Sequence, residues 1–217
     1  MVTPNCRDFL RTAEYAGELK KLSSALLNPM QICQLAIYAA ELCLPIYEDE
    51  TLASNQSGYL INMPRDMLND AKILINSGCT LEQLLKTVTK IDICEKIIDT
   101  GHLPNVAAWW SAKSNVSAAI IISMVLVNDL DDIWSSMVEV VGCSAQAIAY
   151  RAAENNPDPT QRHDIFRAEF EKSLEKIISY GNGLLEQAGK NILGSMSFCP
   201  CRCITSLRER NRITHGN

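Results

Sequence analysis

The chain has 217 residues, of which 47% are hydrophobic and 21% are charged, and its formal net charge is −5. So many apolar residues exclude a chain that is disordered throughout, and they suffice for one domain with a sizeable core. The charge is segregated, because residues 1–189 carry −9 and residues 190–217 carry +4. An acidic body of this kind disfavours binding to nucleic-acid phosphates, and it suits solubility or a basic protein partner.

The pattern of apolar residues is typical of helices. Aromatic residues make up only 6% of the chain, alternating β-branched runs are almost absent, and apolar residues recur at helical spacing. We therefore predict an all-α fold of about eight helices, arranged as an antiparallel multi-helix bundle or a short α-solenoid. A single domain is expected over residues 1–189, followed by a basic, cysteine-rich tail over residues 190–217.

Proline and capping residues mark the first four predicted helices. Pro29 starts the second helix, and Pro45 is expected to kink or end it. Residues 48–62 are polar and are predicted to form an exposed loop, whereas Thr80 and Gln83 form a capping box. These helices are expected over residues 6–27, 29–44, 64–76 and 81–99.

The second half of the chain is predicted to contain four more helices. Asp129 is expected to cap the sixth helix, Gly142 to separate the sixth from the seventh, and Gly181 to interrupt the eighth. These helices are expected over residues 106–127, 130–140, 144–155 and 159–180.

Residues 106–127 are predicted to form the central buried helix. Ser111, Ser114 and Asn115 face roughly away from an apolar face. That face consists of Val106, Trp109, Val116, Ile120, Met124 and Val127. Only about 12 consecutive residues are apolar or small, against the roughly 20 that cross a bilayer, so no transmembrane segment is predicted. The N-terminal residues do not resemble a secretory signal, and we expect a cytoplasmic protein.

Lys113 lies at the same helical angle as this apolar face. Its ammonium group is expected to pair with a carboxylate, to stack on Trp109 or to extend to solvent. The sequence favours an ion pair of structural origin or extension to solvent.

The tightest acidic cluster consists of Asp129, Asp131 and Asp132. Asp131, Ser135 and Glu139 stand at i, i+4 and i+8, which places their oxygens on one helix face, as in a magnesium site. The string from Asp131 to Glu139 is similar to the second metal-binding motif of class I terpene synthases. The helix dipole also favours acidic residues in a first turn, so capping is the simpler interpretation. We predict no catalytic residue and no cofactor, and a small helical metal-dependent enzyme, isoprenoid-type or hydrolase, stays as the alternative.

Seven of the nine cysteines fall into two groups. Those on predicted helices are surrounded by apolar residues and are expected to be buried, reduced thiols. They are Cys33, Cys43, Cys94 and Cys143. In the tail, Cys199, Cys201 and Cys203 are alternative ligands for a soft metal, with His215 as a fourth, or alternative acylation sites. An inert or redox-sensitive tail is the simplest interpretation.

Four segments of the chain combine helix-end and alanine-rich motifs. They are residues 36–48 (AIYAAELCLPIYE), 64–71 (PRDMLNDA), 107–110 (AAWW) and 147–153 (AIAYRAA). This combination resembles a family of α-helical immunity proteins from bacterial polymorphic toxin systems, over about residues 35–187. Met63 stands where that family has an arginine, and residues 55–57 replace its acidic loop. The resemblance implies a helical protein that neutralises a toxin by covering the toxin's active site.

Together, these patterns favour a cytosolic, non-enzymatic protein that binds and neutralises a toxin or another basic protein through an acidic helical surface. The expected partner-binding residues are Glu48, Asp49, Glu50, Asp129, Asp131 and Asp132. The acidic body is not expected to bind nucleic acid. A helical scaffold that forms an oligomer is a further alternative.

Overall fold

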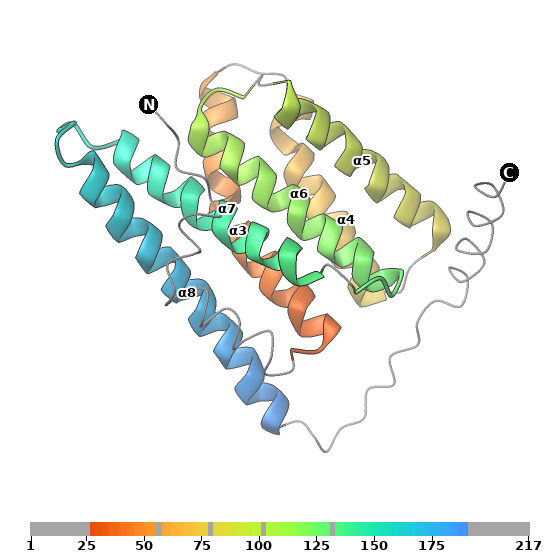
Figure 1. Cartoon of the computed structure of the whole chain (residues 1–217). Helices are drawn as coiled ribbons and strands as arrows, with labels where there is room; N and C mark the ends of the chain where they lie inside the picture. The colour runs from red at the N-terminus through yellow and green to blue at the C-terminus, as the bar shows by residue number, and fades with distance from the viewer. Residues whose placement is uncertain (1–26, 55–57, 78–79, 101–102, 131–132, 191–217) are drawn as a thin grey trace, which may run out of the picture.

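The computed structural model describes residues 27–54, 58–77, 80–100, 103–130 and 133–190 (Figure 1). These residues form six α-helices and no strand, so the predicted all-α fold is confirmed for them. The helices are α3 (Pro29–Ala53), α4 (Gly58–Ser77), α5 (Leu81–Asp99), α6 (Val106–Leu126), α7 (Ile133–Glu154) and α8 (Arg162–Lys190). The helix predicted over residues 6–27 and the tail beyond Lys190 lie outside the described residues.

Helix α3 begins where the sequence predicts it. The Asn28 side chain accepts a hydrogen bond from the Gln31 amide, and the Gln31 side chain accepts one from the Asn28 amide, each at 2.9 Å. Because this reciprocal capping satisfies two amides that have no partner within the helix, it fixes the first turn. The Gln31 side chain also donates to the Leu184 carbonyl at 2.8 Å, which ties the start of α3 to α8.

The predicted end of this helix is wrong, because α3 continues through Pro45 to Ala53. Proline removes the hydrogen bond to the carbonyl four residues earlier, which is that of Glu41. Both Pro45 and Glu41 are exposed, so water can satisfy this carbonyl on the solvent side of the helix. The predicted loop over residues 48–62 is therefore largely helical, and α4 begins at Gly58, before Pro64.

Glycine also fails to end helices in the second half of the chain. Gly142 is buried inside α7, so the two helices predicted on either side of it are one helix. Gly181 and Gly183 lie inside α8, which continues to Lys190. In both helices the residues that flank the glycines pack on the core. The free energy gained by this burial outweighs the cost of about 1 kcal/mol that glycine has in a helix relative to alanine. The expected count of eight helices is wrong for this part of the chain.

Helix α6 lies at the centre of bundle-like packing (Figure 1). Among the described elements it packs against α3, α4, α5 and α7, and α8 covers α7 and α3. Helices α3 and α6 are antiparallel, because Cys43 lies beside Ser111 whereas Glu50, further along α3, lies beside Asn105 at the start of α6. The prediction that residues 106–127 form the central helix is confirmed.

The polar side of α6 is buried, contrary to the sequence prediction. Ser111, Ser114 and Asn115 are fully buried, whereas Val106 on the predicted apolar face is exposed. Small hydroxyl side chains let helices approach closely and donate to carbonyls of the neighbouring helix. The Ser111 hydroxyl donates to the Cys43 carbonyl of α3 at 2.7 Å, and the Ser114 hydroxyl donates to the Val140 carbonyl of α7 at 3.1 Å.

One described helix is long and apolar enough to cross a membrane by length and composition alone, and it is α3 over Pro29–Leu52 rather than α6. Half of its most apolar stretch is buried inside the molecule. Core helices of soluble proteins have the same character.

Candidate functional site

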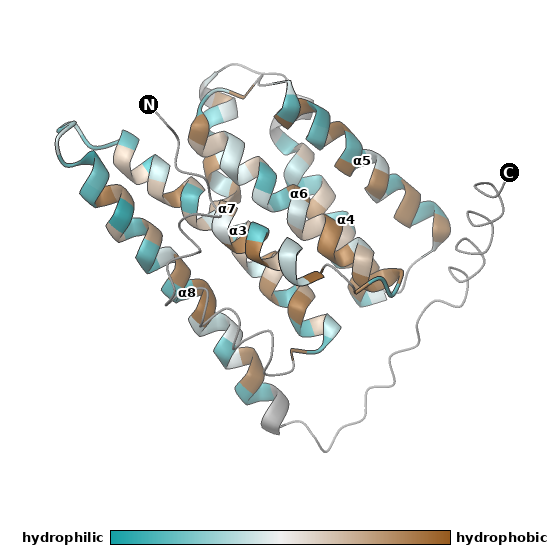
Figure 2. Cartoon of the chain, viewed as in Figure 1, coloured by the Kyte–Doolittle hydropathy of each residue, from teal (hydrophilic) through white to brown (hydrophobic). Residues whose placement is uncertain are grey.

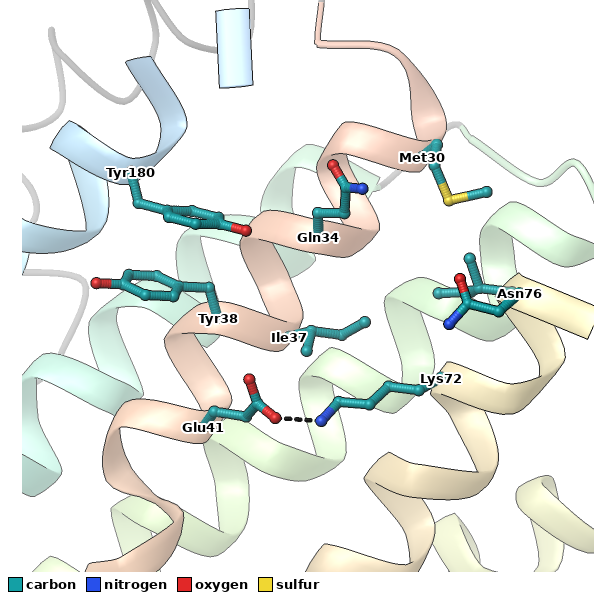
Figure 3. Close-up of a pocket in the computed structure, with 9 residues that line it drawn as sticks. Met30, Gln34, Ile37, Tyr38, Glu41, Lys72, Asn76 and Tyr180 are labelled. Carbon is teal, nitrogen blue, oxygen red and sulfur yellow. Dashed lines mark hydrogen bonds and ion pairs between the residues drawn. The ribbon is translucent and has the colours of Figure 1, made fainter. Parts of the chain in front are cut away.

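A groove of about 250 Å³ lies between α3, α4 and α8 (Figure 3). Side chains on one face of α3 form its floor, and side chains of α4 and α8 form its walls. The floor consists of Met30, Gln34, Ile37, Tyr38 and Glu41, and the walls of Lys72, Ile75, Asn76 and Tyr180. The floor residues recur at i, i+4, i+7, i+8 and i+11, which places them in one stripe of the helix.

Two stacked tyrosines define the α8 side of the groove. The rings of Tyr38 and Tyr180 lie with their centroids 3.9 Å apart and an interplanar angle of 9° (Figure 3). Burial, reinforced by the neighbouring Tyr180, raises the pKa of Tyr38 above its usual value. The Tyr38 hydroxyl therefore stays protonated at neutral pH and can donate a hydrogen bond.

An ion pair bounds the groove on the α4 side. The Lys72 ammonium group donates to the Glu41 carboxylate across the gap between α4 and α3 (Figure 3). Both side chains are partly exposed, so this pair contributes little to stability and leaves charge available to a ligand. The groove thus combines apolar carbons of Met30, Ile37 and Ile75 with polar groups around them.

The size of the groove limits what it can hold. Pockets for drug-sized ligands usually enclose roughly 300–1,000 Å³, which is more than this groove offers. One large side chain of a partner protein fits the available volume better, as at the centre of many protein interfaces. The arrangement is therefore suited to binding an anchor residue and shows no group placed for covalent chemistry.

The first three predicted partner-binding acids lie on α3 rather than in a loop. Glu48 and the Arg65 guanidinium form a two-bond ion pair, with the Nη2 to Oε2 distance at 2.6 Å. Glu50 accepts hydrogen bonds from Asn105 Nδ2 at 2.6 Å and from Arg151 Nη1 at 2.5 Å. Glu48 and Glu50 therefore connect helices of the same molecule, and Asp49, which contacts Arg151 at 3.4 Å and whose side chain is 65% exposed, is the most exposed of the three.

Only one of the other three predicted acids lies within the described residues. Asp129 is half-buried in the turn after α6, whereas Asp131 and Asp132 lie outside the described residues. Of the alternative metal ligands, Ser135 is exposed on α7, and Glu139 pairs with Lys113 at 3.3 Å. Of the three arrangements predicted for Lys113, the structure therefore shows the ion pair. Within the described residues, no group of three or more His, Cys, Asp or Glu side chains is placed to hold a metal ion.

The four cysteines predicted to be core thiols are buried, as expected. Burial raises the pKa of Cys33 and of Cys94 to about 12, and it also raises the pKa of Cys43. Thiols with such pKa values are almost entirely protonated at neutral pH and are poor nucleophiles. Cys199, Cys201, Cys203 and His215 of the tail lie outside the described residues.

Sequence reasoning missed the groove. The available signal was a set of polar or aromatic side chains, Gln34, Tyr38 and Glu41, on one stripe of an otherwise apolar helix. The walls come from α4 and α8, and no local pattern predicts that these helices meet α3 on either side of that stripe.

No known protein family, curated protein or solved structure matches this chain.

Proposed function

We propose that this chain is a non-enzymatic helical protein that binds and neutralises another protein, as an inhibitor or immunity-type protein does. The groove between α3, α4 and α8 is the observation that carries the proposal, because it combines apolar side chains with hydrogen-bonding groups. Buried anchor side chains in such pockets supply a large share of binding energy in protein interfaces. We propose this groove as the centre of the interface.

The acidic charge of the body has a second role in this proposal. Residues 1–189 carry −9, which favours approach of a basic partner over the whole surface. Since Glu48 and Glu50 are engaged within the molecule, Asp49 is the member of the predicted cluster that is best placed to meet a partner directly. Charge steers association, and the groove determines how long the complex lasts.

Groove variants test the proposal. The wild-type chain is used to isolate its partner from the native cell, and the affinity of the purified pair is then measured by calorimetry. Gln34→Trp fills the groove from an exposed position, and we expect it to weaken binding by about tenfold or more, as loss of an anchor pocket does. Ile37→Asp places a charge on the half-buried floor and should have the same effect.

Ile73→Asp is the matched control, because Ile73 is 50% exposed on α4 and does not line the groove. It should leave affinity within about twofold, as a surface substitution outside an interface does. Melting temperatures verify that each variant is folded. Affinity that is unchanged by both groove variants would show that the partner binds elsewhere.

A further inference from the structure

Helix α5 carries an exposed stripe that is apolar in its first half and acidic in its second. Leu81, Leu85 and Val88 are 44%, 57% and 37% exposed, although they are large hydrophobic side chains. Figure 2 shows hydrophobic and hydrophilic segments interleaved along α5. At the same helical angle, and continuing toward the end of the helix, stand Asp92, Glu95 and Asp99. We call these six residues the α5 stripe. It lies beside the face of α5 that is buried against α4 and α6.

The acids of the α5 stripe are unpaired within the described residues, a property that they share with exposed acids elsewhere, such as Asp66 and Glu175. By contrast, Asp70 on the neighbouring α4 pairs with Lys90 of α5 at 2.5 Å. Three unpaired carboxylates beside three exposed apolar side chains fit a segment that is first apolar and then basic.

The chain contains such a segment beyond α8. Ile204 and Leu207 precede three arginines, Arg208, Arg210 and Arg212, within nine residues. Residues 190–217 carry +4, in contrast with the acidic body. The order of apolar and basic residues in this segment matches the order along the α5 stripe, provided that the two run in the same direction.

The packing of the helices supplies that direction. Because Gln31 near the start of α3 bonds the Leu184 carbonyl, α8 ends beside the N-terminal end of α3. The start of α3 lies at the end of α6, since these helices are antiparallel. Helices α5 and α6 are antiparallel as well, because the Trp109 indole near the start of α6 donates to the Ile98 carbonyl near the end of α5 at 3.2 Å. The chain therefore leaves α8 at the end of the molecule where α5 begins.

Residues 191–203 are long enough to connect the end of α8 to the start of α5. The spacings from α8 to α3, from α3 to α6 and from α6 to α5 amount together to about 30 Å, at 8–10 Å per helix spacing. The 13 residues over 191–203 span up to roughly 43 Å when extended, at about 3.3 Å per residue. From Leu81 to Asp99 the stripe is about 27 Å long at 1.5 Å per residue.

We propose that residues 204–212 of this chain bind along the α5 stripe. Ile204 and Leu207 cover the exposed apolar half of the stripe, and the three arginines pair with Asp92, Glu95 and Asp99. This contact removes exposed apolar surface from water and neutralises charge that has no other partner. It does not depend on the groove or on the proposed function.

Disulfide trapping in the full-length chain tests this contact. Bound in this register, the tail places Cys199, Cys201 and Cys203 near the first turns of α5. Glu82→Cys introduces a thiol at an exposed position in the first turn of α5, beside Leu81, in a background of Cys6→Ser and Cys79→Ser. Under mild oxidation we expect an intramolecular disulfide between position 82 and the tail, identified by peptide mass spectrometry.

Ser179→Cys is the control, because position 179 is exposed on α8 and is closer in sequence to the tail cysteines. The Glu82→Cys disulfide should form at least about fivefold faster than the Ser179→Cys disulfide, because docking raises the effective concentration of the tail. Adding Asp92→Lys, Glu95→Lys and Asp99→Lys should reduce the rate to that of the control.

Three results would overturn the proposal. Equal rates at positions 82 and 179 would show that the tail has no preference for α5. A rate that is insensitive to the triple charge reversal would show that the acids do not hold the arginines. Disulfide-linked dimers in place of the intramolecular product would show that the stripe binds a second copy of the chain.

Discussion

Gly183 occupies a helical position in α8 that has room for a side chain. A Cβ atom built there meets no atom within 4 Å, and its φ lies outside the range that disfavours other residues. Gly183→Ala should therefore raise the free energy of unfolding by about 0.5–1 kcal/mol, since alanine has less backbone freedom to lose on folding. For a domain of this size that is a rise in melting temperature of roughly 2–4 °C per kcal/mol, measurable by calorimetry.

Gly181 provides the comparison for this substitution. It lies two residues earlier in the same helix but is buried. Because added volume is harder to accommodate at a buried position, Gly181→Ala should be less favourable than Gly183→Ala. If the two substitutions stabilised the protein equally, local packing around α8 would be looser than the structure indicates.

Glu154 at the end of α7 is placed unfavourably for a carboxylate. Its pKa is raised above the usual value by burial and by the nearby charge of Glu50, despite opposing effects of Arg162 and Arg151. A raised folded-state pKa means that the folded protein binds the proton more tightly than the unfolded chain. The corresponding stabilisation is complete below the unfolded pKa of about 4.3 and is lost as pH rises through the folded pKa.

Glu154→Gln removes this pH dependence, because glutamine stays neutral. The melting temperature of the variant relative to the wild type should increase from pH 4 to pH 7 and then level off. The measurement is a series of thermal melts at constant ionic strength. A difference that stayed constant with pH would contradict the assigned pKa direction.

At the scale of helices, Glu50 connects three elements that the sequence does not place together. It accepts hydrogen bonds from Asn105, which also caps α6, and from Arg151 of α7. Glu50→Ala should lower the free energy of unfolding by about 1–2 kcal/mol, because hydrogen bonds to a charged, partly buried group are lost. Urea denaturation monitored by circular dichroism measures this change.

Asp49→Ala is the adjacent control. The Asp49 side chain is 65% exposed and reaches Arg151 at 3.4 Å, so its loss should cost less than about 0.5 kcal/mol. This contrast also corrects the assumption that residues 48–50 form a loop without a structural role. Equal effects of Glu50→Ala and Asp49→Ala would argue against the three-helix connection.

The helix starts were predictable, whereas several ends were not. Asn28 and Thr80 cap α3 and α5 as expected, because a capping box depends on residues three positions apart and is written in the local sequence. Pro45 and Gly142 were predicted to interrupt helices because proline and glycine have low helix propensity. Whether they do so depends on whether the carbonyl that loses its hydrogen bond faces water and whether the neighbouring residues are buried, and both are properties of the tertiary structure.

The buried serines of α6 show the same limit on sequence reasoning. The hydrophobicity pattern placed Ser111 and Ser114 on the polar side of the helix. Because their side chains are small, α3 and α7 approach α6 closely, and the serine hydroxyls donate to carbonyls of these two helices. A hydropathy pattern does not distinguish a serine that faces water from one at a close helix contact. The class of fold was thus predictable, but the packing order that creates the groove was not.

At the scale of the whole molecule, α5 is at the edge of the packing. Among the described helices it packs chiefly against α4 and α6, whereas α3 and α7 contact the central helix and α8 as well. Helices with fewer buried contacts open more readily in local unfolding. The buried thiols report such openings, because Cys94 lies on α5, Cys43 on α3 and Cys143 on α7.

We therefore expect Cys94 to react with a thiol reagent before Cys43 and Cys143 under native conditions. Since burial raises the pKa of Cys94 to about 12, its thiolate is scarce at pH 8 in the folded state, and modification requires opening of the helix. Rates for each cysteine are measured by mass spectrometry of peptides after timed labelling. Cys43 and Cys143 should react together and more slowly, because the hydrogen bonds of the Ser111 and Ser144 side chains to α3 join α3, α6 and α7 into one unit that opens only in global unfolding. A single rate for all three thiols would mean that α5 unfolds only with the rest of the bundle, despite its position at the edge.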